Sequence, residues 1–257
     1  MLERLTRAEL SEATQVRVNA LENRVVMVTG ATGGLGRAVS YDAAKQGATL
    51  ILLAKDEARL DQLYDEIREL GAPEPLIIKV DLATLGESHV AEIVRGVEQH
   101  FGRLDALLHA AGQLGALRPL EQYPPNLWRE VLSVNLGSAF MLTQQLLVLM
   151  DRGSDASIVW VDAQSTLGAG AYWGAYGVAA ASIRALAEAW AGELENTSKV
   201  RCSLVYPGPL RTSLRAAAFP AQDPSQLQDP KDVAPWISYL LSAHSRSICS
   251  KFVDLSL

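Results

Sequence analysis

The sequence has few of the residues that build disulfide frameworks or metal sites. It contains two cysteines, Cys202 and Cys249, and four histidines among 257 residues. The cysteines form no disulfide framework, and neither residue type falls at the spacing of a metal-ligand motif. We therefore predict that no metal is bound, and we interpret both cysteines as small buried or half-buried side chains.

The chain also lacks an excess of positive charge and a long apolar run. Its 23 Lys and Arg residues stand against 29 Asp and Glu residues, a net charge of −6 that disfavours a broad surface for nucleic-acid phosphates. No stretch approaches about 18 uninterrupted apolar residues. Residues 1–18 carry acidic charge and no apolar core, unlike a signal peptide. We predict no nucleic-acid partner, no membrane partner and a cytoplasmic location.

Residues 24–36, RVVMVTGATGGLG, join a short β-branched apolar run to four closely spaced glycines. The next residues, RAVSYDAAKQG, have helical spacing, so the pattern predicts a buried strand, a glycine turn and a helix. We expect the backbone to turn sharply at Gly30, to let a pyrophosphate approach at Gly34, and to bring helix and strand together at Gly36. Because a helix N-terminus offers unpaired N–H groups to an anion, this stretch indicates a nucleotide site.

Strand-like and helix-like patterns alternate along the rest of the chain. Expected strands cover residues 49–53, 76–80, 104–109, 157–161, 200–206 and a short stretch near Phe252, with helices between them at 56–70, 87–100, 126–150, 172–195 and 231–243. This alternation predicts an α/β fold, a three-layer, doubly wound parallel sheet. Residues 1–23 would form an N-terminal arm or helix, and residues 24–257 a single domain. The irregular segment 209–230 is a candidate lid over the substrate.

Several candidate functional segments directly follow predicted strands. They are Gly30–Gly36, Asp81, Ala110–Gly112, Ala163 and Pro207–Gly208. Ligands of such sheets bind beyond the carboxyl ends of the strands, near the point where the strand order reverses. We therefore expect these segments to gather along one rim of the sheet.

In their order and spacing these motifs resemble those of the short-chain dehydrogenase/reductase family, over nearly the whole chain. Thr29–Gly36 matches its TGxxxGxG turn, His109–Gly112 is similar to its NNAG element, and Pro207–Gly208 with Thr212 matches its PGxxxT element. The resemblance implies a Rossmann fold, a nicotinamide cofactor and hydride transfer to or from a small carbonyl or alcohol. It implies cofactor contacts from Gly30, Thr32, Gly33, Gly34, Leu35, Gly36, Lys55, Asp81, Leu82, Ala110, Ala111, Gly112, Tyr176, Pro207, Gly208 and Thr212.

The sequence departs from this family at two catalytic positions. Tyr176 matches the active-site tyrosine and Asn135 the helix asparagine, but the family's lysine and serine are replaced by Ala180 and Ala163. Ser165, two residues further on, is the candidate to stand in for the serine. A lysine four residues after the tyrosine would share its helix face and lower its pKa. Without that lysine we expect the Tyr176 pKa to stay near an ordinary ~10.

Other positions bear on that missing lysine. Arg184 lies two turns past Tyr176, too far along the helix axis to replace it. A frame centred on Tyr172 would put Tyr176 at the lysine position. Asp162 is either a substitute acid or a structural residue at a strand end, and we favour the structural interpretation.

We therefore predict a weak NADP(H)-dependent reductase-like enzyme whose catalytic residues are Tyr176, Asn135 and Ser165. The alternative is a nucleotide-binding homologue without turnover, acting as a sensor, scaffold or partner subunit. Lys55, after Ala54 at the end of a predicted strand, favours NADP(H) over NAD(H), because the resemblance implies that a basic residue there accommodates the 2′-phosphate.

The remaining candidates have structural as well as functional interpretations. We interpret His109 as a hydrogen-bonded structural histidine. The aromatic residues Trp160, Tyr172 and Trp173 would line either a substrate pocket or the core. The helices 126–150 and 172–195 are more apolar than a one-sided surface helix requires, which indicates a partner helix. The family resemblance implies a homodimer or tetramer built through them.

Overall fold

In this computed structural model, residues 2–13, 19–162, 170–248 and 251–256 are described. They form one eight-stranded sheet with the order β1-β8-β7-β6-β5-β2-β3-β4, and every strand pair is parallel. The strands are β1 Glu3–Thr6, β2 Val25–Thr29, β3 Thr49–Ala54, β4 Leu76–Lys79, β5 Ala106–His109, β6 Ala156–Val161, β7 Val200–Tyr206 and β8 Lys251–Asp254. This is the predicted doubly wound α/β architecture.

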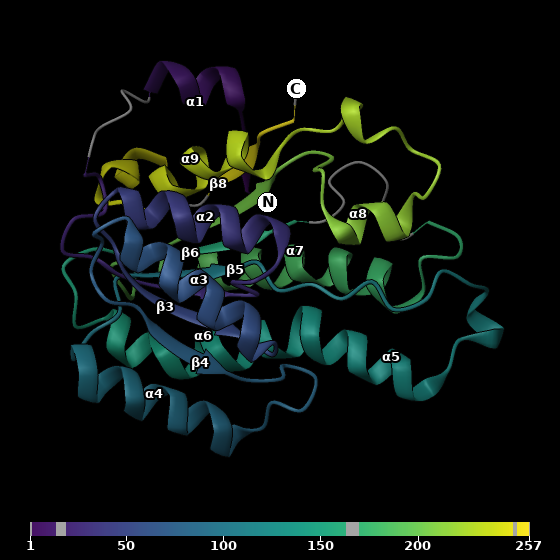
Figure 1. The fold of residues 1–257 in the computed structure, drawn as a ribbon, viewed down its shortest axis with the longest axis horizontal. Helices are drawn as coiled ribbons and strands as arrows, with labels where there is room; N and C mark the ends of the chain where they lie inside the picture. The colour runs from purple at the N-terminus through teal and green to yellow at the C-terminus, as the bar shows by residue number, and fades with distance from the viewer. Residues whose placement is uncertain (1, 14–18, 163–169, 249–250, 257) are drawn as a thin grey trace.

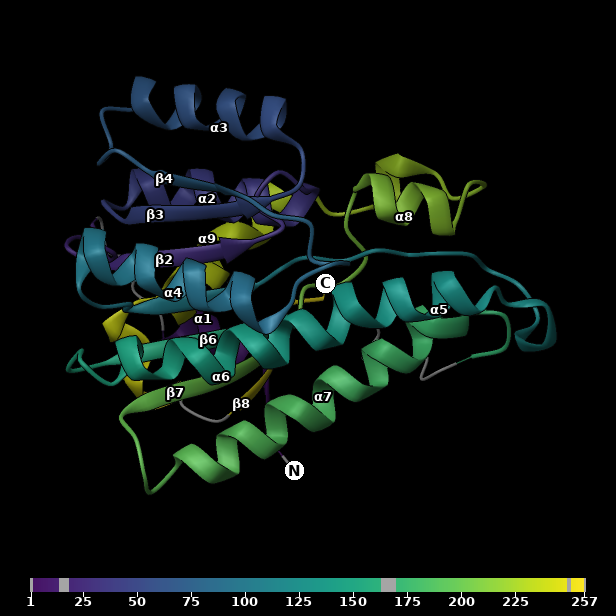
Figure 2. The ribbon, with the colours of Figure 1, turned by 90° about the horizontal axis from the view of Figure 1, so that it is seen from below.

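Helices cover both faces of the sheet (Figures 1 and 2). On one face lie α1 Arg7–Ala13, α2 Gly34–Lys45, α3 Glu57–Glu69 and α9 Pro230–Leu241, and on the other lie α4 Glu87–Phe101, α6 Ser138–Met150 and α7 Gly174–Leu194. α5 Pro125–Leu132 precedes α6 and packs in a separate, smaller cluster with Tyr123 and the start of α7. β2 shows why the sheet needs both layers. All five of its residues are buried, and its side chains alternate between the two cores, with Val26 and Val28 in one and Met27 in the other.

The strand order reverses at β2. From β2 the chain adds β3 and then β4 on one side, and it crosses back to place β5 on the other side of β2. The segments that leave β2 and β5 are therefore neighbours at the carboxyl edge of the sheet. Ligands of doubly wound sheets bind in the crevice at such a reversal.

The N-terminal segment differs from the predicted arm or helix over residues 1–23. Glu3–Thr6 forms β1, which pairs with β8 at the edge of the sheet, and α1 covers only Arg7–Ala13. An ion pair of 2.5 Å between Arg4 and Asp254 supports this pairing. The sequence prediction missed the strand because the residues ERLT carry no apolar alternation, and their partner lies at the other end of the chain.

The predicted helix 126–150 is continuous but not uniform. It comprises α5, a π-helical turn at Ser133–Gly137 and α6. Residues Pro125–Met150 are long and apolar enough to cross a membrane by length and composition alone, although the sequence contains no uninterrupted apolar run of that length. Within the domain, Leu142, Leu146 and Leu149 of this helix are buried in the core against the sheet, so the fold accounts for much of its apolar character.

The predicted irregular segment 209–230 contains a short helix, α8 Ser213–Ala218. Its two ends are joined, since the Arg211 N–H donates to the Gln228 carbonyl over 2.8 Å. An ion pair of 2.5 Å between Arg211 and Asp229 also connects the two ends of the segment. The segment is therefore a loop whose two ends are bonded to each other. Figure 2 shows that α8 lies beyond the carboxyl edge of the sheet.

Candidate active site

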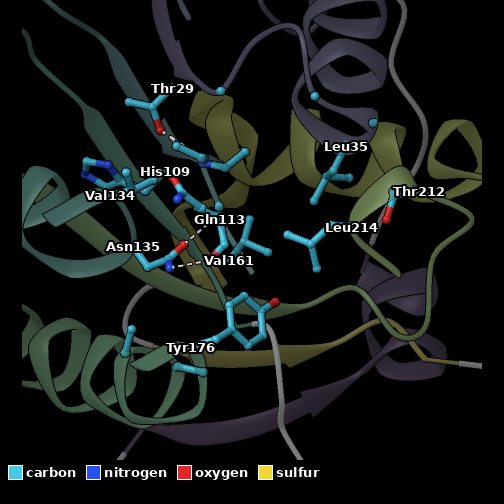
Figure 3. A pocket seen from close by; sticks show the side chains of 18 of the residues that line it. Thr29, Leu35, His109, Gln113, Val134, Asn135, Val161, Tyr176, Thr212 and Leu214 are labelled. Carbon is cyan, nitrogen blue, oxygen red and sulfur yellow. Dashed lines mark hydrogen bonds between the residues drawn. The ribbon is translucent and has the colours of Figure 1, made fainter. Parts of the chain in front are cut away.

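A cavity of about 540 Å³ lies at the carboxyl edge of the sheet, over the reversal in strand order. Its walls come from the turn after β2, from the segments after β3, β4, β5, β6 and β7, from α7, and from the 209–230 segment. Figure 3 shows Asn135, Tyr176, Thr212 and Leu214 around this space. Four of the five predicted strand-end segments therefore gather along one rim, and the fifth, Ala163, lies outside the described residues.

The turn between β2 and α2 depends on glycine at two positions. Gly30 has a φ of +64°, and a Cβ there would lie 2.6 Å from the Ala111 Cα, inside any permitted contact. At Gly36 a Cβ would lie 2.3 Å from the carbonyl oxygen of Gly30. The first requirement brings the turn against the segment after β5, and the second packs α2 against the turn, as predicted.

The start of α2 suits an anion. The helix begins at Gly34, and Gly33 before it has no side chain that could cap the first N–H groups. These groups and the helix dipole favour negative charge at the cavity wall. A Cβ at Gly34 would lie 2.6 Å from the Thr212 methyl group, so the 209–230 segment closely approaches this turn.

Thr29 joins the two strands at the reversal. Its hydroxyl accepts hydrogen bonds from the N–H groups of Ala110 and Ala111, over 3.2 and 3.3 Å, and donates to the Leu108 carbonyl over 3.3 Å. A serine or threonine is needed here because the same oxygen must both donate and accept. The segment after β5 is thereby held beside the glycine turn.

The structure brings together almost all of the predicted cofactor residues. The cavity is lined by Gly30, Thr32, Gly33, Gly34, Leu35, Lys55, Asp81, Leu82, Ala110, Ala111, Gly112, Tyr176, Pro207, Gly208 and Thr212. Gly36 does not line it and lies one position behind, against the Gly30 carbonyl. Asn135 lines the cavity as well.

Two cations lie at the end of the cavity beside β3. Lys55 follows the strand, and Arg59 lies one helical turn later on α3. The side chain of Asp56, between them, accepts a hydrogen bond of 3.2 Å from the Arg59 N–H and so caps α3. Arg59 is a site residue that the sequence analysis missed, although the N-cap aspartate places it in the first turn of the helix that follows Lys55 and could have identified it.

Asn135 lies on the π-helical turn and holds the segment after β5. Its Oδ1 accepts from the Gln113 N–H over 2.8 Å, and its Nδ2 donates to the carbonyls of Gln113 and Val131, over 2.8 and 3.0 Å. A π turn shifts one residue out of the regular helical ladder, as is frequent at functional sites. Asn135 therefore positions the loop at Gln113, a cavity residue that the sequence analysis did not name.

Tyr176 extends from the first turn of α7 into the cavity (Figure 3). Burial, and to a lesser extent the nearby Asp162, raise the pKa of its phenol to about 12, and Arg215 opposes the shift. The expectation of an ordinary phenol pKa was therefore wrong, because it left out desolvation. Ala180, one turn along the same helix, also lines the cavity and supplies no charge there.

The remaining catalytic candidates divide into three cases. Ser165 and Ala163 lie outside the described residues. Asp162 accepts a hydrogen bond of 2.5 Å from Arg184, so the structure favours its interpretation as a structural residue at the end of β6. Tyr172 is 63% exposed and does not line the cavity, which favours the frame centred on Tyr176.

His109 is buried at the end of β5. Its Nε2 shares a hydrogen bond of 2.9 Å with the Thr143 hydroxyl, and its ring stacks on Trp160. Burial lowers its pKa to about 3, so the imidazole is neutral at physiological pH. The structural interpretation of His109 therefore fits these contacts, and Trp160 is a core residue.

The comparisons with known proteins agree with this geometry. A family model described as short chain dehydrogenase matches residues 24–223. The uncharacterized oxidoreductase YciK of Escherichia coli strain K12 is 34% identical over 232 residues, which are 90% of this chain and 91% of that protein. In the described part of the chain, no group of three or more His, Cys, Asp or Glu side chains could hold a metal ion.

Solved structures extend the agreement to the whole domain. A short chain dehydrogenase from Salmonella enterica serovar Typhi has a TM-score of 0.88 at 33% identity and covers 95% of this chain and 100% of its own. A short-chain-dehydrogenase structure from Escherichia coli CFT073, complexed with NADPH, has a TM-score of 0.87 at 31% identity, with coverages of 95% and 100%. With the glycine turn, Asn135 and Tyr176 all inside the matched region, this chain belongs to the short chain dehydrogenase family.

Proposed function

We propose that this protein reduces a small carbonyl compound with NADPH, slowly, in the cytoplasm. The observation that carries the proposal is the buried Tyr176 phenol in the cavity, with Ala180 in place of a cation one turn further on. Because its pKa is about 12, the phenol stays protonated at neutral pH. It can donate a proton to a developing alkoxide but is a poor base, so reduction is favoured over alcohol oxidation.

The cofactor preference rests on charge at one end of the cavity. Lys55 and Arg59 would hold the 2′-phosphate that distinguishes NADPH from NADH, and the uncapped start of α2 would receive the pyrophosphate. When bound, the nicotinamide would supply the hydride for the carbonyl carbon. The NADP and NADPH complexes of structurally similar chains support this choice.

The proposed weakness has two causes. Tyr176 lacks the neighbouring ammonium that would ease loss of its proton, and Ala163 offers no hydrogen bond to the reacting oxygen. One oxyanion donor is typically worth about 3 kcal/mol of transition-state stabilisation. Ser165 remains the proposed substitute for that donor, with Asn135 holding the neighbouring loop.

The test measures binding and turnover separately. Titration with NADPH and NADH should show tighter binding of NADPH, and Lys55→Gln should weaken NADPH binding but not NADH binding. With NADPH, a panel of aldehydes and ketones should be reduced at rates that fall to background in Tyr176→Phe. Undetectable binding of either cofactor at millimolar concentration would contradict the proposal.

Cofactor binding without any turnover would favour the alternative, a nucleotide-binding sensor, scaffold or partner subunit. The observation that supports this alternative is the loss of both the lysine and the serine, at Ala180 and Ala163. In that case NADPH binding should persist unchanged in Tyr176→Phe.

We also propose a homodimer or tetramer through the helices 126–150 and 172–195. Phe140 and Val148 on α6 and Val178 on α7 are exposed apolar side chains, at 42%, 55% and 37%. Light scattering should give a mass of two or four chains, and Val148→Glu should lower that mass. A monomer at micromolar concentration would overturn this part of the proposal.

A further inference from the structure

One cation lies at the Tyr176 end of the cavity without an acidic partner. Arg215, on α8, lines the cavity, as Lys55 and Arg59 do at its opposite, β3 end. Arg184, on the same helix as Tyr176, is paired with Asp162. Among the described residues, no carboxylate lies within ion-pair distance of the Arg215 guanidinium, so its charge is not balanced locally by this chain.

Arg215 is held in place by groups that leave part of it available. Its guanidinium carbon lies 3.7 Å from the centroid of the Phe219 ring, and its Nε donates to the Gln222 Oε1 over 2.8 Å. These contacts occupy one face and one N–H of the fork. The two terminal amino groups keep the edge that pairs with a planar anion.

A row of aromatic rings links this cation to the catalytic tyrosine. The Phe219 and Trp173 centroids are 5.5 Å apart, and those of Trp173 and Tyr176 are 5.9 Å apart. Arg215 is also near enough to lower the Tyr176 pKa through its charge. The guanidinium and the phenol therefore face the same part of the cavity.

Partial burial of an unpaired cation favours binding of an anion. Removal from water lowers the Arg215 pKa, which means that the charged form is destabilised there. An anion that takes the place of the lost water offsets the free-energy cost of desolvating the guanidinium. Hydrogen bonds between ionised partners are also stronger than those between neutral ones. With one cation at this end, the matching ligand is a monoanion.

Resting on the proposed reductase function, we propose that Arg215 binds the carboxylate of an oxo acid whose carbonyl group lies against the Tyr176 hydroxyl. The substrate class is thus a small carbonyl compound with one carboxylate. The planar fork of arginine matches a carboxylate in two parallel hydrogen bonds. Arg215 is then a specificity-determining residue supplied by the 209–230 segment.

The experiment measures reduction at saturating NADPH of a series of oxo acids and of their methyl esters. In this series about two to five carbons separate the carbonyl group from the carboxylate. For at least one acid, kcat/KM should exceed that of its ester, and Arg215→Gln should lower it by about 10- to 100-fold, mainly through KM. The kcat/KM for the ester should be unchanged in Arg215→Gln. Lys231→Gln removes one positive charge from an exposed position just after the same segment and outside this cavity, and it should change kcat/KM for neither substrate.

Three results would overturn the inference. No difference between any acid and its ester would exclude a carboxylate site. Equal losses for acid and ester in Arg215→Gln, with a shifted pH profile, would mean that Arg215 acts on Tyr176 instead. An unchanged kcat/KM for the acid in Arg215→Gln would exclude any role of Arg215 in substrate binding.

Binding separates this inference from the proposed function. Calorimetric titration of an oxo acid into the NADPH complex should give a dissociation constant that rises in Arg215→Gln but not in Lys231→Gln. Such binding without turnover would support the anion site and contradict the reductase. Turnover of neutral carbonyl compounds without any binding of the oxo acid would support the reductase and contradict the anion site.

Discussion

The side-chain amide of Asn135 bonds both the N–H and the C=O of Gln113, each over 2.8 Å. Together with its bond to the Val131 carbonyl, this uses both amide hydrogens. The π-helical turn and the loop after β5 are thus joined by one side chain that must donate twice and accept once. Of the twenty side chains, only asparagine has both this length and these groups.

Asn135→Asp should therefore destabilise the protein although it is nearly isosteric. The carboxylate keeps the acceptor for Gln113 N–H but faces two carbonyl oxygens without a proton to donate. We expect a loss of about 2 kcal/mol or more in urea unfolding at pH 7.5, and weaker NADPH binding because the loop lines the cavity. Asn126→Asp, an exposed position at the start of α5, is the control and should not destabilise, because a negative charge suits a helix N-terminus and keeps the acceptor for Arg129. Equal stability of the two variants would contradict the positioning role.

Gly174 shows a similarly strict requirement at the start of α7. Its φ is +51°, and a Cβ there would lie 2.2 Å from the Tyr123 Cε2. Gly174→Ala should cost about 3 kcal/mol or more, through backbone strain and the displaced ring, and should lower activity because Tyr176 follows two residues later. Gly192→Ala on the same helix meets no atom within 4 Å and should stabilise by about 0.5–1 kcal/mol. Thermal unfolding of both variants tests this prediction. A Gly174→Ala variant as stable as the wild type would contradict the requirement for glycine.

The fold was predictable because each buried strand carries its own signal. The runs at β2, β3 and β6 are apolar on both faces, and the glycine turn marks the first crossover. β1 was not predictable in this way, since its four polar-rich residues are ordered by β8, about 250 positions away. Local pattern cannot report a pairing that only the finished sheet creates.

The site was predictable where backbone geometry dictates the residue. Gly30 and Gly36 follow from the turn itself, whereas Gln113 and Arg215 line the cavity only because a π turn and a folded loop bring them there. The Tyr176 pKa was missed for the same reason. Sequence spacing exposed the absent lysine, but the extent of burial belongs to the packed structure.

His109 should make stability depend on pH. Its pKa falls from 6.5 to about 3 on folding, so the unfolded chain binds the proton first as the pH drops, and stability is lost between these values. Between pH 7.5 and pH 5 the loss from this group is about 2 kcal/mol. In His109→Gln, which can still bond Thr143, that part of the pH dependence should vanish in urea unfolding. His100→Gln, at an exposed position, should keep it. Identical pH slopes for wild type and His109→Gln would contradict the burial of a neutral imidazole.

Ala180→Lys tests whether the missing ammonium limits the chemistry. A lysine four residues after Tyr176 shares its helix face, and its charge beside the phenol should lower the pKa from about 12. Each unit of that decrease raises the phenolate fraction at pH 8 about tenfold. Alcohol oxidation with NADP⁺ should gain most, since it needs the tyrosine as a base, and its pH profile should shift to lower pH. Adding Ala163→Ser should raise the rate further by restoring a hydrogen-bond donor.

Ala181→Lys places the same charge on the exposed side of the same helix, so it controls for net charge and helix propensity. It should leave oxidation and its pH profile unchanged. If Ala180→Lys folds and binds NADPH like the wild type yet oxidises no faster at any pH, the absent lysine does not limit this site. The weakness would then lie in the orientation of Tyr176 toward the substrate, which Gly174 and Trp173 set at the start of α7.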